Sequence, residues 1–321
     1  MTGPLLVGDI GATNARFALV GDRGAIERIR VLACEDYGRI EDAIEAYLSA
    51  EVNGALRPRA AALAVAGPVT GERIALTNHP WSFAAVALRD ALRFEQLRVV
   101  NDFAANALAV PHLASTDRMA VGGGTAASDA AIGVIGPGSG LGVSGLVMAQ
   151  GGWRVIDSEG GHVTMAATSE REEAVLARMR RRFDHVSAER VLSGPGLVNL
   201  YNSLAEIDGV PAAAYLPAQI ADPGIGEQDP RCREAVELFC AMLGTVAGNL
   251  ALTLGARGGV YIAGGIVPRL GSAFAASGFR ARFEEKGRMR PYVAAIPTFV
   301  VTHPIPAFIG LAALAASDPR G

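Results

Sequence analysis

The chain has 321 residues, which is long enough for two domains of ordinary size. Hydrophobic residues make up 50% of it and charged residues 19%, a balance typical of a globular enzyme and not of a disordered chain. The formal net charge of −3 gives no electrostatic basis for binding nucleic acid or an anionic membrane.

The lysine and cysteine content further limits the kind of enzyme and the cellular compartment. Lys286 is the single lysine among 29 basic residues, and its context EEKGRMR fits neither a P-loop nor the strand lysine of a protein kinase. Cys34, Cys232 and Cys240 form no C-x-x-C pattern, and the apolar start meets Asp9 too early for a signal peptide. We therefore expect a cytoplasmic protein without disulfides.

The first third of the chain alternates apolar strand patterns with helical ones. Turn residues GATN separate the first two strands, and Pro111 ends the last helix. The expected strands are 5–10, 15–20, 27–33, 61–67 and 97–101, and the expected helices are 38–50, 81–94 and 102–110. This alternation predicts an α/β layered sheet.

The rest of the chain repeats part of this pattern. Residues 131–148 again read strand, glycine-rich turn, strand, as residues 5–20 do, which indicates an internal duplication. We expect later helices to begin at a Ser169–Glu172 capping box, at residue 194, at Asp229-Pro230 and at Pro306. The helix from Asp229-Pro230 should end at Gly255, and a strand should lie within 258–265.

Residues 238–256 carry no charge over 19 positions and include Gly244-x-x-x-Gly248, so they imitate a membrane span. The segment contains Asn249 and continues a charged amphipathic start, PRCREAVE. We therefore interpret it as the buried helix of a soluble domain and expect no membrane contact.

Asp9-Ile-Gly-Ala-Thr-Asn14 places an acid at a strand end before a turn of small residues. Backbone N–H groups and the Thr13 hydroxyl can hold phosphate oxygens there, while Asp9 faces Mg²⁺, usually through water. An ordinary hairpin turn is the alternative.

Gly136-Pro-Gly-Ser-Gly-Leu-Gly142 is a second glycine-rich turn. A dinucleotide fingerprint needs a helix after the glycines, but the following VSGLVM is β-like. We therefore expect a second phosphate turn, or a glycine-rich hairpin without a ligand. The pair Gly264-Gly265, after the strand GVYIA, suits flat contact with an adenine ring or a plain helix start.

Asn101-Asp102 ends a strand and opens a helix, the position where α/β sheets bind ligands. Asp102 is either an N-cap or the acceptor of a substrate hydroxyl proton, with a pKa kept low by the helix N-terminus. Glu159-Gly-Gly-His162 and Glu189 supply further groups that would bind a neutral polyol. Each alone is more often a surface acid or a core histidine.

Seven motifs in this order make the chain resemble the bacterial glucokinase family, in the non-ROK branch of the actin/hexokinase/heat-shock ATPase superfamily. They are DIGATNAR, LTNHPW, VVNDFAANALAVP, GPGSGLG, EGGH, SAERVLSGPGLVNLY and AGGIVPR. The likeness runs from residue 5 to residue 316. D-x-G-x-T alone is weak, but VNDF with EGGH and SAERVLSGPGL is specific to this branch.

The resemblance implies phosphorylation of D-glucose by Mg-ATP to give glucose 6-phosphate, the first step of glycolysis. It implies that Asp102 is the general base on the sugar 6-hydroxyl, with glucose held by Asn101, Asp102, Glu159, His162 and Glu189. The implied nucleotide positions are Asp9, Gly11, Ala12, Thr13 and Asn14 in the first phosphate motif, Gly138, Ser139 and Gly140 in the second, and Gly264 and Gly265 in the adenosine motif. Asp9 would face Mg²⁺. Ala12 stands where the family often has glycine, and Ser139 where many members have threonine.

The family fold is a two-domain actin-like ATPase (ribonuclease H-like) fold, with duplicated mixed sheets flanked by helices and a cleft that closes on sugar. We expect a small α/β domain of residues 1–111 plus 303–321, a large one of 112–302, and a cytoplasmic homodimer. A kinase of another hexose and a catalytically silent sugar sensor remain the alternatives.

Overall fold

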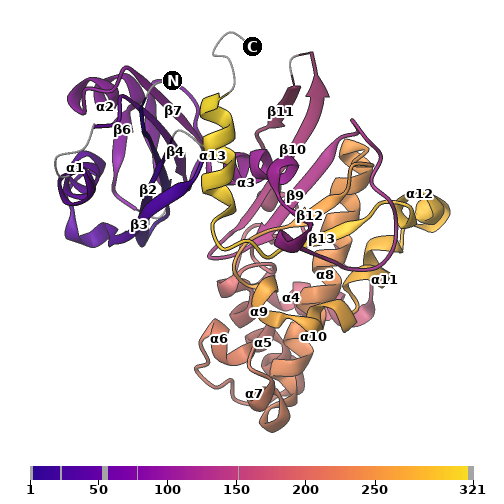
Figure 1. Cartoon of the computed structure of the whole chain (residues 1–321). Coiled ribbons are helices and arrows are strands. Elements are labelled where there is room, and N and C mark those ends of the chain that lie inside the picture. Colours follow the sequence, from indigo (N-terminus) through magenta and orange to yellow (C-terminus); the bar gives the residue numbers. More distant parts are fainter. Residues whose placement is uncertain (1–2, 22–23, 53–56, 78, 151, 317–321) are drawn as a thin grey trace. The chain divides into compact units, whose positions relative to one another are not determined.

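The computed structural model describes residues 3–21, 24–52, 57–77, 79–150 and 152–316. The chain divides into two compact units, each with its own mixed sheet (Figure 1). Unit 1 comprises Met1–Ala114, Gln150–Asp157 and His303–Gly321, and unit 2 comprises Ser115–Ala149 and Ser158–Thr302. The segment Gln150–Asp157, expected in the large domain, falls in unit 1, where β11 (Gly152–Ile156) contacts α3 (Asp102–Ala109).

The sheet of unit 1 has the order β3-β2-β1-β4-β7. β2 is antiparallel to its neighbours β1 and β3, whereas β4 is parallel to both β1 and β7. The strands are β1 (Leu5–Ile10), β2 (Asn14–Val20), β3 (Ile26–Ala33), β4 (Ala60–Val65) and β7 (Gln96–Asn101). All five were predicted from the apolar runs.

Alternate residues of these strands supply two separate cores. Leu6 and Ile10 belong to the cluster that includes Ile44 of α1 (Ile40–Glu51), whereas Val7 belongs to the cluster with Phe308 of α13 (Pro306–Ala316). Figure 1 shows α13 beside α3, and a Cβ on Gly310 of α13 would lie 1.9 Å from the Ala105 carbonyl oxygen. The absence of a side chain there is what allows this close helix packing.

The predicted helix over residues 81–94 is wrong in its first turn. Ser82–Ala84 form β6, which pairs antiparallel with β5 (Arg73–Ala75), and α2 covers only Ala85–Ala91. Pairing with a neighbouring segment outweighs the helical spacing of the side chains here. Two short 3₁₀ helices complete the unit, η1 (Cys34–Asp36) and η2 (Val110–His112).

The strands of unit 2 follow the order β10-β9-β12-β13-β8. β9 and β10 form an antiparallel hairpin, β12 and β13 run parallel to β9, and β8 closes the edge antiparallel to β13. The strands are β8 (Arg118–Ala120), β9 (Ile132–Pro137), β10 (Leu141–Ala149), β12 (Val260–Ile262) and β13 (Thr298–Val301). A strand-turn-strand hairpin therefore occurs in both units, as the repeated sequence pattern predicts. In both units two later strands also run parallel to the first strand of the hairpin.

Helices supply most of the core of unit 2. The α-helices are α4 (Glu170–Met179), α5 (Gly194–Asp208), α6 (Pro217–Ile220), α7 (Pro223–Gln228), α8 (Pro230–Leu254), α9 (Val267–Leu270), α10 (Ser272–Ala276), α11 (Phe279–Glu284) and α12 (Arg290–Ala294). The 3₁₀ helices are η3 (Ser115–Asp117), η4 (Gly160–His162) and η5 (Gly287–Met289).

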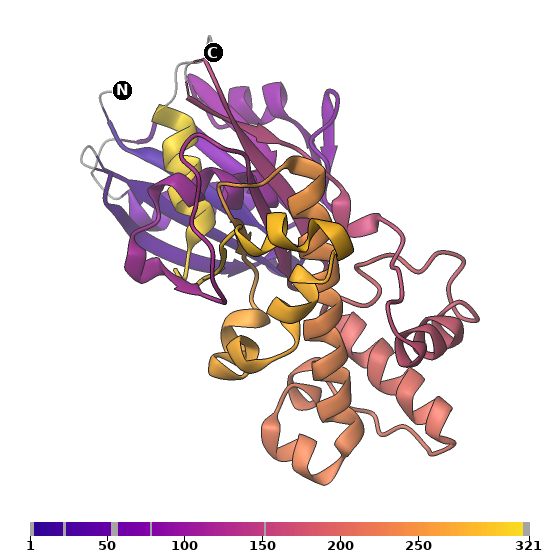
Figure 2. The ribbon, with the colours of Figure 1, turned by 90° about the vertical axis from the view of Figure 1, so that its right-hand side faces the viewer.

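The long orange helix in Figure 2 is α8, and its ends confirm the sequence prediction. The Asp229 side chain accepts a hydrogen bond from the Arg231 N–H, and Gly255 ends the helix with a φ of 60°. Among the described helices, α8 is the one long and apolar enough to cross a membrane, yet 61% of its apolar window is buried in the structure. Gly244 and Gly248 face the carbonyl oxygens of Phe279 and Phe283, where a Cβ would lie 2.2 and 2.7 Å away. The glycine pair therefore serves helix packing within unit 2.

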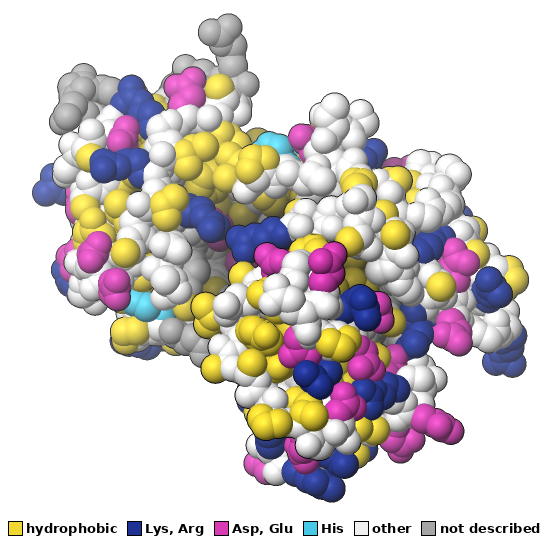
Figure 3. Space-filling view, turned by 90° about the horizontal axis from the view of Figure 1, so that it is seen from below, with side chains coloured by type: hydrophobic (Ala, Val, Ile, Leu, Met, Phe, Trp, Pro, Cys, Tyr) yellow, Lys and Arg dark blue, Asp and Glu magenta, His cyan; other side chains and the backbone are white. Residues whose placement is uncertain are grey.

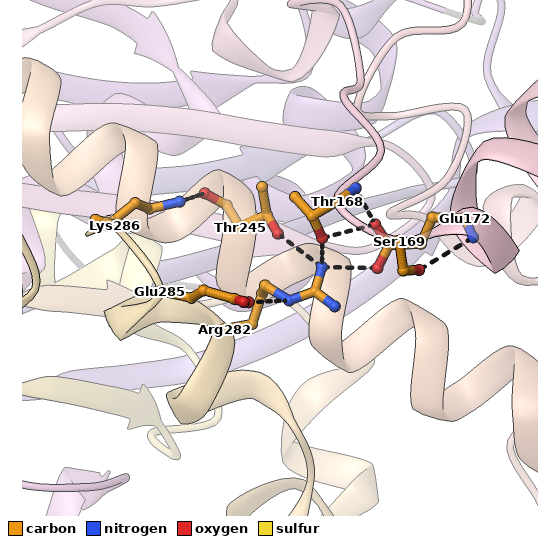
Figure 4. Close-up of polar contacts among 7 residues, drawn as sticks. All are labelled: Thr168, Ser169, Glu172, Thr245, Arg282, Glu285 and Lys286. Carbon is orange, nitrogen blue, oxygen red and sulfur yellow. Dashed lines mark hydrogen bonds and ion pairs between the residues drawn. The ribbon is translucent and has the colours of Figure 1, made fainter.

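A buried polar cluster joins α4, α8 and α11 (Figure 4). Glu172 is fully buried and accepts hydrogen bonds from the Thr168 N–H at 2.7 Å and from Arg282 Nη1 at 2.7 Å. Lys286 Nζ donates to the Thr245 carbonyl oxygen at 3.1 Å. Burial, followed by the Arg282 charge, lowers the pKa of Lys286. The single lysine thus has a structural contact.

The expected capping box at α4 forms only in part. Ser169 Oγ accepts a hydrogen bond from the Glu172 N–H at 3.3 Å, as a cap should. The Glu172 carboxylate is committed to Thr168 and Arg282 instead of returning to the Ser169 backbone. Leaving the buried Glu172 carboxylate without its partners would cost more free energy than leaving one N–H at the helix start without a second cap.

Candidate active site

The polar motifs of unit 1 meet at one edge of its sheet. The parallel register aligns Ile10, Val65 and Asn101, the last residues of β1, β4 and β7. The first phosphate motif and the Asn101-Asp102 pair therefore leave the sheet at the same carboxyl edge, the side on which α/β sheets bind ligands.

The first glycine-rich turn connects β1 to β2. Its Gly11 N–H donates to the Asn14 carbonyl oxygen at 2.9 Å. The Cys34 N–H donates to the Thr13 carbonyl oxygen at 2.8 Å, and Cys34 Sγ lies 3.5 Å from the Gly11 carbonyl oxygen. Ala12 is not among the described residues with positive φ, so alanine is unstrained at this position of the turn.

Asp9 lies on β1 opposite Arg16 of β2, and the two side chains form an ion pair of 3.1 Å. Burial raises the pKa of the Asp9 carboxyl, and the Arg16 charge and hydrogen bond act in the opposite direction. Arg16 is half exposed, at 49% of its side-chain surface. A carboxylate near a strand end, beside a turn that can hold phosphate, is the kind of ligand that binds a phosphate-bound Mg²⁺.

Asn101, and not Asp102, is the N-cap of α3. Asn101 Oδ1 accepts from the N–H groups of Phe103 and Ala104, at 2.8 and 3.3 Å, while Nδ2 donates to the Gly67 carbonyl oxygen at 3.1 Å. Asp102 is the first helical residue, and its Oδ1 also accepts from the Phe103 N–H at 2.9 Å. The helix thus has its cap without Asp102, although part of that carboxylate is engaged locally.

The second glycine-rich turn connects β9 directly to β10, which rules out a Rossmann turn, since that needs a helix there. The Gly138 N–H donates to the Gly140 carbonyl oxygen at 2.8 Å, and Ser139 is exposed at the tip. The turn is clamped at Gly138, whose carbonyl oxygen accepts from the Gly194 N–H at 2.8 Å. Gly194 is the first residue of α5, capped by Ser193.

The EGGH and SAER motifs lie side by side at the start of β10. The Glu189 N–H donates to the Gly161 carbonyl oxygen at 2.9 Å, and Glu189 Oε2 accepts from the Leu141 N–H at 2.9 Å. A Cβ on Gly161 would lie 1.9 Å from the Leu141 carbonyl oxygen, so only glycine permits this approach. Three motifs that are far apart in the sequence therefore meet at Leu141.

Glu159 and His162 present accessible side chains at the two ends of η4. Their exposed fractions are 57% and 59%, and Glu159 Oε2 lies 3.9 Å from His162 Nε2. The His162 carbonyl oxygen is held by His185 Nε2 at 3.1 Å. Fixed backbone with accessible carboxylate and imidazole groups suits recognition of hydroxyl groups.

The adenosine motif lies beside the second turn. Gly264 follows β12 with a φ of 82°, and a Cβ there would lie 2.4 Å from the Pro137 carbonyl oxygen. The Ile266 N–H donates to that same oxygen at 3.4 Å. Gly138 and Gly265 have no atom within 4 Å of the position a Cβ would take. Both leave bare backbone open to a ligand.

The structure thus brings the predicted site residues together in two sets. Asp9–Asn14 and Asn101-Asp102 share the sheet edge of unit 1, whereas unit 2 holds the second turn, Glu159, His162, Glu189 and the Gly264-Gly265 pair. Asn78 of the LTNHPW motif lies outside the described residues.

Three supporting residues were missed from the sequence. Leu141 and Gly67 act through backbone atoms, which leave no signal in residue type. Ser193 donates to the Glu189 carbonyl oxygen at 2.8 Å and accepts from the Gly196 N–H at 3.0 Å. A serine two residues before Pro195 is a helix-cap signal that could have been found.

Comparison with known proteins places these features in one family. The family model described as "Glucokinase" matches residues 6–318. A glucokinase from Paramagnetospirillum magneticum is 54% identical over 321 residues, covering 100% of this chain and 99% of that protein. A glucokinase from Aromatoleum aromaticum is 48% identical over 97% of this chain and 94% of that protein.

Solved structures agree with the fold. A glucokinase from an Antarctic psychrotroph superimposes with a TM-score of 0.87 at 38% identity, covering 98% of this chain and 99% of that one. The Balamuthia mandrillaris glucokinase in complex with glucose gives 0.79 at 21% identity, covering 99% and 94%. With the two mixed sheets, these likenesses confirm the predicted α/β fold of the actin-like ATPases.

Proposed function

Because the chain belongs to the glucokinase family and phosphorylates D-glucose to glucose 6-phosphate, the first step of glycolysis, we propose that Asp102 is the general base. It accepts the proton of the sugar 6-hydroxyl as that oxygen attacks the γ-phosphate of ATP. The observation that supports this role is the cap of α3: Asn101 supplies it, so the helix does not need Asp102 for capping. The helix N-terminus favours the ionised carboxylate that a base requires.

The sugar is held by Asn101, Asp102, Glu159, His162 and Glu189. Carboxylates accept hydrogen bonds from sugar hydroxyls, and the amide and imidazole groups donate or accept them. The interlocked backbones of the EGGH and SAER motifs support this assignment, because they hold Glu159, His162 and Glu189 on one framework. A wrong epimer would leave one of these groups unpaired, which gives the site its preference for glucose.

The nucleotide is ATP, bound by the two glycine-rich turns and the adenosine motif. Gly11, Ala12, Thr13 and Asn14 face its phosphates from one turn, and Gly138, Ser139 and Gly140 from the other. The bare backbone at Gly138 and Gly265 fits this use, since a polyphosphate and a flat ring both need close approach to N–H groups and Cα atoms.

The chemistry of Asp9 fits a magnesium ion held with the phosphates of ATP. Mg²⁺ is usually bound through one or two carboxylates together with phosphate oxygens and water, and Asp9 supplies one carboxylate beside the first turn. When bound, the ion neutralises charge that develops on the phosphoryl oxygens. Arg16, which pairs with Asp9 in this structure, has to share or release that carboxylate.

We infer a cytoplasmic homodimer of the non-ROK branch that binds neither nucleic acid nor membrane. The EGGH and SAERVLSGPGL motifs support the branch, and the three cysteines are free and buried. Acidic and basic side chains are interspersed on the face drawn in Figure 3, with no large patch of one sign.

Light scattering after size exclusion tests the dimer. Compaction by glucose in small-angle scattering tests closure of the cleft.

The deciding experiment is a steady-state assay with Mg-ATP on glucose, mannose, fructose and N-acetylglucosamine. Asp102→Asn keeps the shape of the side chain but removes the proton acceptor, so we expect kcat to fall about 10²–10⁴-fold while glucose affinity changes little. Asp222→Asn is the matched control, because Asp222 caps α7 and is not among the site residues. A near-native kcat in Asp102→Asn refutes the base role.

A further inference from the structure

Pro137 and Leu141, the residue pair next to the turn of the β9–β10 hairpin, form hydrogen bonds with residues of other motifs. Leu141 stands opposite Pro137, which has no N–H to donate. The Leu141 N–H goes to the Glu189 carboxylate, and the Pro137 carbonyl oxygen accepts from Ile266 of the adenosine motif. Both ends of the second phosphate turn are therefore held by other motifs. Glu189 of the proposed sugar site binds Leu141, and Ile266 of the adenosine motif binds Pro137.

The turn has a second link to the same segment. The Gly138 carbonyl oxygen accepts from the Gly194 N–H, and Ser193 joins that helix start to the Glu189 carbonyl oxygen. A Cβ on Gly140 would lie 2.5 Å from Glu189 Oε2, so the carboxylate lies directly against the turn. Both ends of the segment from Glu189 to Gly194 thus contact the turn. Glu189 binds the Leu141 N–H, and Gly194 binds the Gly138 carbonyl oxygen.

A carboxylate has more acceptor sites than the single one Leu141 uses. Sugar hydroxyls can therefore bind Glu189 while it holds the Leu141 N–H, and they restrict its rotation when they do. The turn then loses freedom before ATP arrives, and ATP meets a site that is already ordered. Coupling between two ligands is reciprocal, so ATP must tighten glucose binding by the same factor.

We infer that Glu189 is a positioning residue that couples glucose binding to the second phosphate turn through the Leu141 N–H. The inference rests on the proposed role of Glu189 as a sugar ligand and adds a second task for the same carboxylate. Its consequence is that an occupied sugar site raises the affinity for the triphosphate.

The test measures, by calorimetry, the affinity of the magnesium complex of a non-hydrolysable ATP analogue with and without saturating glucose. For the native protein we expect glucose to tighten the analogue about tenfold, within the range usual for coupled sites. Glu189→Ala removes the acceptor of the Leu141 N–H and brings that ratio close to one. Glu189→Gln keeps an oxygen that can accept the same N–H, so it retains most of the ratio.

Glu159→Gln is the control, since it alters another carboxylate of the proposed sugar site, whose Oε2 lies 3.9 Å from His162 Nε2. We expect weaker glucose binding with the native ratio preserved at saturation. A native ratio in Glu189→Ala, or an equal loss in Glu159→Gln, overturns the inference. If neither substitution weakens glucose binding, the proposed sugar site itself is wrong.

Hydrogen exchange at the Leu141 amide gives a readout that needs no ligand. Without sugar, the amide should exchange faster in Glu189→Ala than in the native protein, and Glu189→Gln should restore protection. Glucose should slow the exchange further in the native protein. Native protection of Leu141 in Glu189→Ala overturns the inference even if that variant binds glucose too weakly to saturate.

Discussion

The two glycine-rich turns occupy equivalent places in the two units but are anchored differently. The first turn, after Asp9, is held by neighbouring residues of unit 1: Arg16 of β2 pairs with Asp9, and Cys34 of η1, directly after β3, contacts the turn. The second turn, after Pro137, depends on Glu189 and Gly194, which lie about 50 residues further along the chain, in a turn and at the start of α5. The two similar turns are thus stabilised in different ways. The first turn is held by nearby residues, whereas the second is held by Glu189, a residue of the proposed sugar site.

We expect Gly161→Ala to disrupt most strongly the contacts that hold the second turn at Leu141. The added Cβ would lie 1.9 Å from the Leu141 carbonyl oxygen, so backbone has to move. We expect a destabilisation of about 1–3 kcal/mol, typical of overpacking, together with a large loss of kcat. Thermal unfolding and the steady-state assay measure the two effects.

Gly138→Ala is the control for that change, because nothing lies within 4 Å of its Cβ position. Its melting temperature should stay native, whatever happens to its ATP affinity. Equal destabilisation in both variants would mean that crowding at Leu141 is not what makes Gly161 necessary.

A matched pair of substitutions sharpens the comparison between the turns. In Gly140→Ala the new methyl group lies 2.5 Å from Glu189 Oε2 and displaces the carboxylate, whereas in Gly11→Ala it meets the Asn14 carbonyl oxygen at 3.4 Å. We expect the KM for glucose to rise roughly tenfold in Gly140→Ala, as for loss of a charged hydrogen bond, and to stay near native in Gly11→Ala. Similar KM values in the two variants would contradict this.

Asp9→Asn separates stability from function at the first turn. Burial raises the pKa of Asp9 above its unfolded value of about 3.9. The carboxyl therefore lowers stability increasingly as the pH rises from the unfolded to the folded pKa, and the full cost is present above the folded pKa. The neutral amide avoids that cost, and we expect a melting temperature about 2 °C higher at pH 7, equivalent to under ~1 kcal/mol.

The gain of Asp9→Asn should shrink as the pH falls from the folded pKa of Asp9 to its unfolded pKa, and should vanish below it, because the wild-type carboxyl is then protonated in both states. Turnover should fall at every pH, since Asp9 is the proposed magnesium carboxylate. Asp184→Asn, at an exposed position, should show neither effect. A pH-independent gain in Asp9→Asn would argue that the ion pair and not burial decides its stability.

The smallest effect is expected at Cys34. Its thiol is buried, burial raises its pKa, and its contact with the Gly11 carbonyl oxygen is long, at 3.5 Å. Because a thiol is a weak donor, Cys34→Ala should raise the KM for ATP by less than about threefold. A tenfold rise would show that the first turn is not as self-contained as its backbone contacts suggest.

Sequence reasoning succeeded where the signal is local. The limits of α8 follow from Asp229, Pro230 and Gly255, which act on their own neighbours. It failed where distant segments decide: β6 exists because β5 pairs with it, and Glu172 abandons its capping box for Arg282. The resemblance supplied the site residues, but not the contact between Glu189 and Leu141, which arises only once the tertiary fold forms.

The packing of α13 in unit 1 has a consequence for synthesis. Val7, Ala62 and Ala64 near the beginning of the chain share their core with Phe308 and Leu311. During translation this sheet face lacks its covering helix until Pro306–Ala316 has been made. Unit 2 contains α8 with its glycine-facing partner α11 and can bury its own apolar surface earlier. The sheet of unit 1 is therefore made before the helix that covers it, and nascent chains expose an apolar sheet face to chaperones or to aggregation until α13 has been made.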